Sequence, residues 1–298
     1  MMKMNKQRKT TMSLAAATIA LAGTAAHGAS TVYEPFANSD ASLTGNATGT
    51  GLTGNWAGDG RVDILSTNLT YGSLETSGNT AFTDGSWHAN QANIDTTAGY
   101  NGLLADSGEM WFSMLYRKDV GNGRFYFSIS DGGMSNNGNL GTGVTGIGFG
   151  STGSNLYAGL WETNAWGASN LGGPAASSVD VSGDMTVNSG DSGSLAGVTT
   201  YLIVGHAQWG ANGTADDTVT LYLPGTDLAL GSAVAQSVGV VAQSGFDKIN
   251  TNHGNGLSSR WDELRIGATY ADVTPVPEPT TTALLGLGGL ALILRRRK

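Results

Sequence analysis

Short runs of alternating hydrophobic and polar residues recur along most of the chain. Clusters of Gly, Asn, Ser and Thr separate them about every ten residues. The clearest run is 110–118, in which Phe112 and Met114 fall on one face and Trp111 and Leu115 on the other. A period of two residues is typical of a strand with two differently packed faces. The pattern therefore predicts β-strands separated by turns.

Turn residues between these runs predict how the strands pair. Asn122-Gly123 favours a hairpin between 110–118 and 124–130, and a polar loop at 208–217 joins two further alternating runs. Those runs are Thr199–Ala207 and Thr218–Leu223. Further strands are expected at Asn155–Trp161, Val234–Val241, Gly245–Thr251 and Ser259–Gly267.

The body of the chain, residues 29–272, shows no helical periodicity over twelve residues and no internal repeat. About 245 residues of strand are too many for one open sheet, so two packed sheets are required. The 46 glycines also argue against long helices, which glycine destabilises. The sequence therefore predicts an all-β, two-sheet sandwich.

Residues 1–28 differ in pattern from the body. Basic residues come first, the apolar run Met12–Ala26 follows, and the small residues Ala26 and Gly28 flank His27. This order is typical of a secretory signal peptide, which we expect to be helical and to be cleaved near Gly28.

The other end combines Pro277-Glu278-Pro279, the apolar run Ala283–Leu294 and a basic end, Arg295–Lys298. As a helix the twelve apolar residues cover only ~18 Å, which is short for a bilayer core of ~30 Å. Basic residues favour the cytoplasmic side, which leaves the body outside. A plain tail anchor would not explain Pro-Glu-Pro.

Together these features resemble the PEP-CTERM sorting signal of Gram-negative bacteria, over residues 275–298. The resemblance implies export by the secretion machinery and a transient inner-membrane anchor, a short C-terminal transmembrane helix. It also implies removal of the tail by an exosortase that recognises Pro277, Glu278 and Pro279. The final location would be the cell surface or the extracellular matrix.

The charge distribution excludes one class of partner. Eight of the 15 basic residues lie at the two ends of the chain, within 1–28 and 295–298, so the chain between them has seven basic and all 23 acidic residues, a net charge of −16 (7 minus 23). Such a body repels nucleic acid, so we expect no nucleic-acid partner. Because the chain has no Cys, thiol catalysis and thiolate metal sites are excluded as well.

Several strand segments resemble a second family. They are Tyr33-Glu34-Pro35-Phe36, Thr200–Val204, Val219–Leu223, Phe246–Ile249, Trp261–Gly267 and Tyr270–Pro275. They are similar to the concanavalin A-like, laminin G-like jelly-roll domains that precede PEP-CTERM tails. This resemblance implies a two-sheet jelly roll and no particular activity, because the fold hosts lectins, glucanases and scaffolds.

Catalytic chemistry lacks a signature in the sequence. Jelly-roll glucanases place Glu-x-Asp-x-Glu on one strand, and none of the six Glu residues here is followed two positions later by Asp. Asp262, on the predicted face of Leu264 and Ile266, is expected to be a buried hydrogen-bond acceptor. We therefore expect no enzymatic activity. The alternative is a polysaccharide hydrolase or lyase whose acid pair comes from separate strands.

Exposed tryptophans suggest a ligand class. Sugar-binding sites stack aromatic planes on sugar rings, and three of the seven tryptophans lie in or beside polar, Gly-rich stretches. Trp161, Trp166 and Trp209 are therefore the candidate carbohydrate-binding residues. Trp111 and Trp261 lie within strands and are expected in the core. The predicted role is a non-catalytic envelope or matrix protein with polysaccharide as the candidate ligand.

Loop oxygens suggest one candidate cofactor, calcium. Asp131 lies near Asn136 and Asn137, and Asp216 adjoins Asp217 in the 208–217 loop. Asp and Asn are also common in such loops because they suit turns, so both explanations stay open. His206 is expected to be a core or edge histidine rather than a ligand.

Overall fold

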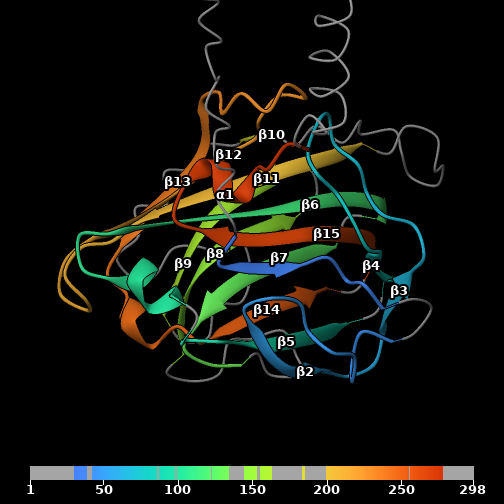
Figure 1. Ribbon diagram of the computed structural model, residues 1–298, viewed down its shortest axis with the longest axis horizontal. Helices are drawn as coiled ribbons and strands as arrows, with labels where there is room; N and C mark the ends of the chain where they lie inside the picture. The colour runs from blue at the N-terminus through green and yellow to red at the C-terminus, as the bar shows by residue number, and fades with distance from the viewer. Residues whose placement is uncertain are drawn as a thin grey trace, which may run out of the picture.

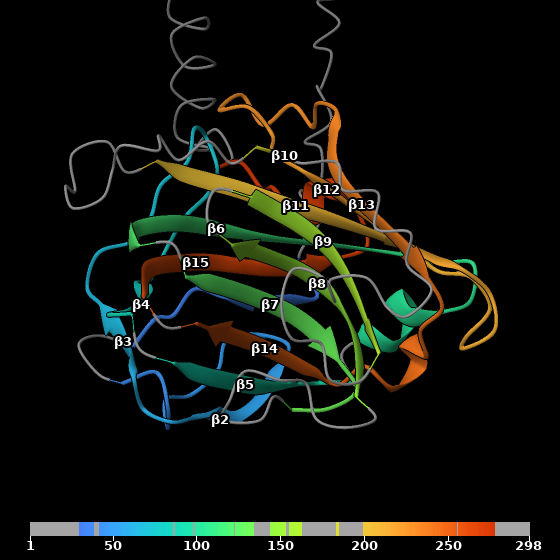
Figure 2. The same cartoon turned by 180° about the vertical axis from the view of Figure 1, so that it is seen from behind.

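Two antiparallel sheets stack face to face in the computed structural model (Figures 1 and 2). The eight-stranded sheet has the order β13-β12-β11-β6-β15-β4-β3, with β1 also paired to β15. Its strands are β1 (Val32–Glu34), β3 (Val62–Leu65), β4 (Thr80–Thr83), β6 (Glu109–Gly121), β11 (Thr200–Gln208), β12 (Asp217–Tyr222), β13 (Ala233–Gly239) and β15 (Leu257–Gly267).

The second sheet has seven strands in the order β10-β9-β8-β7-β14-β5-β2. Its strands are β2 (Leu52–Gly58), β5 (His88–Ile94), β7 (Arg124–Ser130), β8 (Thr145–Thr152), β9 (Asn155–Glu162), β10 (Gly183–Asp184) and β14 (Lys248–His253). Two short 3-10 helices, η1 (Tyr100–Leu104) and η3 (Gln243–Gly245), and one helical turn, α1 (Tyr270–Val273), complete the described fold. The predicted all-β, two-sheet jelly-roll sandwich is confirmed; its finer assignment to the concanavalin A-like group stays a prediction.

The structure describes residues 30–38, 42–85, 87–97, 99–121, 123–133, 144–152, 155–162, 183–184, 199–254 and 256–277. The predicted signal peptide 1–28 and the apolar run of the predicted C-terminal helix lie outside this range. So do Trp166, Glu278 and Pro279, and the predicted domain limits stay predictions.

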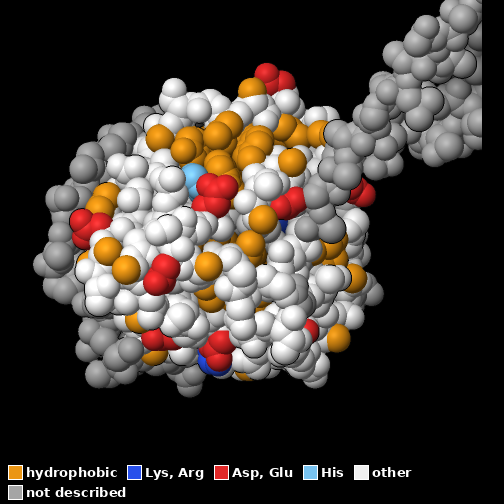
Figure 3. Space-filling model, turned by 60° about the vertical axis from the view of Figure 1, so that its left-hand side comes forward, with side chains coloured by type: hydrophobic (Ala, Val, Ile, Leu, Met, Phe, Trp, Pro, Cys, Tyr) orange, Lys and Arg blue, Asp and Glu red, His pale blue; other side chains and the backbone are white. Residues whose placement is uncertain are grey.

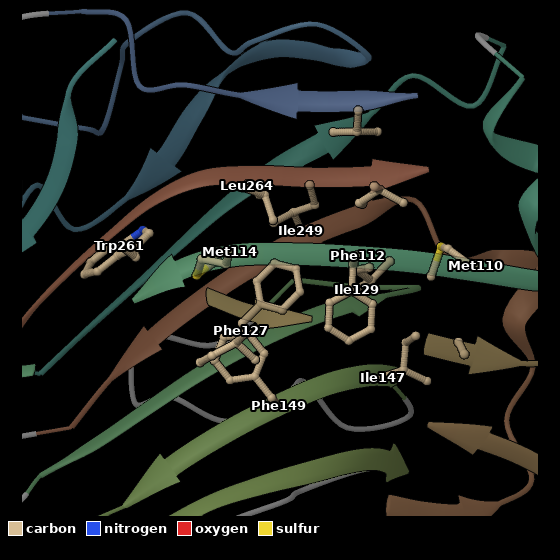
Figure 4. Packing of buried hydrophobic residues seen from close by; sticks show 14 of the residues in the cluster. Met110, Phe112, Met114, Phe127, Ile129, Ile147, Phe149, Ile249, Trp261 and Leu264 are labelled. Carbon is tan, nitrogen blue, oxygen red and sulfur yellow. The ribbon is translucent and has the colours of Figure 1, made fainter. Parts of the chain in front are cut away.

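The core lies between the sheets and follows the predicted alternation of β6. Phe112 and Met114 of β6 face the interior and are fully buried there. Across the core they meet the seven-stranded sheet, with Phe112 5.6 Å from Phe127 between ring centroids and Phe127 5.4 Å from Phe149 (Figure 4). Tilted ring pairs of this kind add to the hydrophobic stabilisation of the core.

The hairpin predicted between 110–118 and 124–130 is wrong. Both strands form, but β6 pairs with β11 and β15 in one sheet, and β7 pairs with β8 and β14 in the other. The chain therefore crosses from one sheet to the other between them. The reason is that each strand has one apolar face. These faces can be buried by pairing the strands in one sheet or by packing them against each other from two sheets, and both arrangements give the same alternating pattern in the sequence. The second predicted pair, β11 with β12, is confirmed.

A β-bulge in β15 changes the predicted faces of that strand. The register shifts between Asp262 and Arg265, and Glu263 has a φ of 54°, in the left-handed region that is rare for residues other than glycine. Trp261 and Leu264 consequently both belong to the core. Asp262 is buried, as expected, but the bulge removes it from the face of Leu264.

A second hydrophobic cluster, here called the outer cluster, covers the other face of the eight-stranded sheet. Strands β6 and β11 supply half of it, and the segments 69–74, 228 and 273 fold over them. Its buried members are Leu69, Leu74, Trp111, Leu115, Leu202, Val204, Leu228 and Val273. The apolar side chains on the second face of β6, Trp111 and Leu115, are thus buried too, by loops instead of by the other sheet.

Candidate functional site

The chain leaves the folded body along a C-terminal strap, residues Thr269–Pro277, that lies on the outer cluster. Three backbone carbonyls fix it, and all three accept hydrogen bonds from the body. Ser30 Oγ donates to Asp272 O (2.5 Å), Ser113 Oγ to Val273 O (2.7 Å), and the Glu75 amide to Pro275 O (2.8 Å). Val276 packs against the outer cluster and Pro277 is exposed. The predicted processing tripeptide therefore starts at an exposed residue of the strap.

Local sequence explains how the strap begins. Thr269 caps α1: its side chain accepts from the Asp272 amide, and the Asp272 side chain accepts from the Thr269 amide. This reciprocal capping box satisfies amides that a four-residue helix would leave unpaired. Tyr270 then donates from its hydroxyl to Leu228 O (2.6 Å), which ties α1 to the loop that covers the sheet.

A buried ionic network lies beside the strap. Glu263 pairs with Arg265 at 2.5 Å, and the two side chains are 0% and 3% exposed. Tyr33 donates to Glu263 Oε2 (2.9 Å), the Ser77 amide donates to Glu263 Oε1, and the Arg265 guanidinium lies 4.5 Å from the centre of the Tyr33 ring. Arg265 Nη2 also donates to Glu75 O (2.7 Å), so the residue that holds Pro275 is itself held by the network.

Burial governs the electrostatics of this network. It raises the pKa of Glu263, and the nearby Arg265 opposes that rise. Burial, helped by the charge of Glu263, raises the pKa of Asp262 to about 8. Asp262 nevertheless accepts from the Leu69 amide (2.8 Å), the Glu263 amide (2.8 Å) and Thr80 Oγ1 (3.2 Å). The carboxyl groups of Asp262 and Glu263 thus each bind backbone amides, so we infer that both position the surrounding backbone.

An aromatic group spans the same face near the strap. The rings of Trp111 and His206 stack at 4.0 Å between centroids with an interplanar angle of 10°. Tyr222 lies 6.2 Å from Trp111, and Tyr270 meets it edge-on at 5.6 Å. His206 Nε2 lies 2.8 Å from Glu109 Oε2. His206 is therefore a partly buried histidine on β11, a strand with neighbours on both sides.

Trp209 is a core residue, which corrects its assignment as a carbohydrate-binding candidate. Its side chain is 4% exposed, and its Nε1 donates to Leu103 O (2.6 Å). Phe246 contacts it edge-on at 6.0 Å. With so little of the ring exposed, Trp209 has no face free for a sugar. The backbone of Trp161 lies in β9, paired with Gly146, and its side chain is outside the described range.

Trp87 is an exposed tryptophan that was not among the predicted binding residues. It is 36% exposed and lies between β4 and β5, where Arg61 Nη1 donates to its carbonyl oxygen (3.2 Å). Asp59 is close to Arg61, at 3.8 Å between charged atoms. Trp87 follows the polar stretch Asp84-Gly85-Ser86, so the rule that selected the other tryptophans also applied to it.

The candidate calcium ligands have structural partners. Asp131 accepts from the Thr145 amide (2.7 Å) and from Thr145 Oγ1 (3.1 Å), which closes the 131–145 connection. Asp217 is fully buried and accepts from the Gly210 amide and the Val241 amide, both at 2.8 Å. Asp217 is therefore corrected from a loop ligand to a buried loop anchor. Asp216 is exposed, and the described residues contain no group of three or more His, Asp or Glu that could hold a metal ion.

The described part of the chain also contains no helix that is both long and apolar enough to cross a membrane.

Comparison with known proteins identifies the C-terminal segment. Residues 275–298 match the family model described as the PEP-CTERM protein-sorting motif, in agreement with the predicted signal. This motif indicates export, exosortase-dependent sorting and a C-terminal membrane anchor before cleavage. No curated protein matches the chain.

Solved structures resemble the body distantly. An endo-beta-1,4-glucuronan lyase from the fungus Trichoderma reesei has 12% identity and a TM-score of 0.39, over 83% of this chain and 98% of that one. An alginate lyase in complex with alginate tetrasaccharide has 15% identity and a TM-score of 0.38, over 80% and 96%. The binding domain of botulinum neurotoxin DC, solved with rat synaptotagmin II, has 11% identity and a TM-score of 0.37, over 78% and 49%. This chain thus spans about half of that toxin fragment, and the fold assignment rests on its own strand order.

Proposed function

We propose that this chain is an exported protein of a Gram-negative cell envelope or extracellular matrix, released from its anchor by an exosortase, with a non-catalytic body that binds polysaccharide. The observation that carries the proposal is the position of the sorting motif. Its match starts at residue 275, and Pro275 and Val276 are still held on the body. The Pro-Glu-Pro tripeptide therefore begins at the exposed Pro277, directly after residues that pack on the body.

The buried carboxyl groups hold backbone amides, and this supports a non-catalytic body. Glycoside hydrolysis requires two carboxyl groups at a fixed separation across the scissile bond, one of them protonated. Asp262 and Asp217 have raised pKa values because they are buried, but both hold loop amides with their oxygens. Glu34 does the same with the Phe36 and Gly49 amides. These groups act in the interior, where no polysaccharide reaches.

We propose that polysaccharide binds at the surface around Trp87. Among the described residues it combines an exposed indole with a neighbouring guanidinium and carboxylate, Arg61 and Asp59. An indole face stacks on a sugar ring, and the charged pair supplies hydrogen bonds beside it. Trp161 and Trp166 stay predictions for the same ligand class.

Processing gives the first test of the proposed function. In cells with an active exosortase, mass spectrometry should find the wild-type protein without Arg295–Lys298. Glu278→Ala should keep the tail in essentially all molecules, because the carboxylate between the two prolines is a recognised group. Thr282→Ser, a control outside the tripeptide, should be processed like wild type. A wild-type protein that retains its tail would favour a simple tail anchor.

Binding gives the second test. On a glycan array of envelope and algal polysaccharides, Trp87→Ala should weaken binding by ~1–3 kcal/mol, roughly 5- to 150-fold, as for bases stacked on aromatic side chains. Val120→Ala removes another exposed hydrophobic side chain (42%) and should leave binding unchanged. Turnover of any of these polysaccharides that disappears on replacing a single Asp or Glu would establish the enzymatic alternative. A protein that neither binds nor cleaves them would have a purely structural role.

A further inference from the structure

Hydrophobic side chains gather on the surface around the strap. Five partly buried residues that pack against the outer cluster form this exit patch: Tyr71, Tyr222, Leu230, Tyr270 and Val276. Figure 3 shows hydrophobic side chains concentrated on one part of the surface. Three of the five are tyrosines, and two of these bind their hydroxyls inward, Tyr71 to Pro224 O (2.5 Å) and Tyr270 to Leu228 O (2.6 Å). The patch is therefore rigid, amphipathic and adjacent to the chain exit.

The length of chain after the strap limits how far this patch can lie from the membrane. Pro277 is exposed at the end of the strap, and the apolar run starts six residues later, at Ala283. Six residues span at most ~20 Å when fully extended, and the headgroup layer accounts for ~5–8 Å of that distance. The exit of the body thus stays within about 15 Å of the membrane surface. A body of about 245 residues has a radius of gyration of ~18 Å, so the tether is shorter than the body is wide.

We propose that, before cleavage, the exit patch rests on the outer surface of the lipid bilayer, with its tyrosine rings in the headgroup layer. This inference rests on the proposed processing of the C-terminal segment, which requires an anchored precursor. Tyrosine rings are enriched at the headgroup level of membrane proteins. A tether this short also raises the local concentration of the patch at the membrane into the millimolar range, so a weak contact is populated while the tail is attached. Cleavage removes the tether, and the contact is then lost.

Charge selects the kind of lipid. Asp227 and Glu75 are exposed beside the patch, and the charge of Asp227 contributes to raising the pKa of Tyr71 and of Tyr270, after burial. The body as a whole is strongly acidic. Zwitterionic headgroups are therefore the expected partner, and added anionic lipid should weaken the contact.

The absence of cysteine permits a direct test on the full chain. Single cysteines at the exposed positions Ala229 and Ala271, near the patch, and Thr53, on β2 at the edge of the other sheet, would carry an environment-sensitive fluorophore. On preformed phosphatidylcholine vesicles we expect blue-shifted emission and protection from iodide quenching at A229C and A271C. Emission at T53C should stay as in water. Tyr222→Glu with Leu230→Glu should abolish the shift without releasing the chain from the vesicles.

Two outcomes overturn the proposal and are distinguishable. Labels at A271C and T53C that are equally accessible to iodide, on chains that float with the vesicles, would overturn the membrane contact and leave the processing proposal intact. Chains that do not float with the vesicles would overturn both, because the precursor would then have no anchor.

Discussion

Replacing Arg265 with methionine should lower the free energy of unfolding of the body by about 3–5 kcal/mol. The substitution leaves the Glu263 carboxylate buried without its 2.5 Å partner, and removing one member of a buried ion pair costs that much because the other charge stays desolvated. It also removes the donor to Glu75 O, so the segment that holds Pro275 is loosened. Urea denaturation measures the effect as a lower midpoint at unchanged slope.

A surface pair provides the matched control. Arg61 and Asp59 lie 3.8 Å apart, and the Arg61 side chain is 57% exposed, so Arg61→Met should cost about 0–1 kcal/mol. The double variant E263M/R265M should regain part of the loss, because it removes both buried charges. Equal losses for Arg61→Met and Arg265→Met would show that the network does not stabilise the body.

The body should be most stable at mildly acidic pH and should lose stability as the pH rises from 5 to 8.5. Asp262 has a pKa of about 8 when folded, against ~3.9 in an unfolded chain, so the folded state holds an extra proton between these values. The stability that this raised pKa contributes is fully present below pH ~4. It is lost progressively as the pH rises to about 8, by at most ~1.4 kcal/mol per pH unit. Burial raises the pKa of Glu34 and Glu263 too, which acts in the same direction.

Thermal midpoints at the two pH values test this expectation. Wild type should melt at a clearly lower temperature at pH 8.5 than at pH 5, and Asp262→Asn should reduce that difference, whatever its own cost in stability. Asp63→Asn, at an exposed position of β3, should leave the difference as it is. A wild-type midpoint that is flat or rises between pH 5 and 8.5 would contradict the sign derived from Asp262.

Features encoded in contiguous residues could be predicted from the sequence. The alternation within β6 assigned both of its faces, because a strand with two apolar faces shows them directly at period two. The Pro-Glu-Pro tail was recognised because its motif is also a contiguous run of residues. The β6–β7 hairpin failed because alternation reports which side chains are buried together and does not report whether two strands share backbone hydrogen bonds. The Glu263 bulge likewise leaves no mark on a period-two pattern.

The candidate site depends on contacts between distant residues, and this limited its prediction. Trp111, His206, Tyr222 and Tyr270 come from four separate segments, and only the strand order places them together. Trp209 and Trp87 both border polar stretches, yet one is buried and the other exposed. Trp209 is buried by residues distant in the sequence, Leu103 and Phe246, which local composition does not encode.

The pairing of β1 with β15 determines when the body can fold during export. A chain that crosses the membrane with its N-terminus first delivers β1 at the start and β15 near the end, and Tyr33 and Glu263 are 230 positions apart. Closing so long a loop is slow, and until then the incomplete sheet exposes unpaired edges of β1 and β6. The C-terminal anchor emerges only after β15. The anchored precursor is therefore the first species in which the complete fold is possible, and the membrane holds it as a single dilute chain while the last strand pairs.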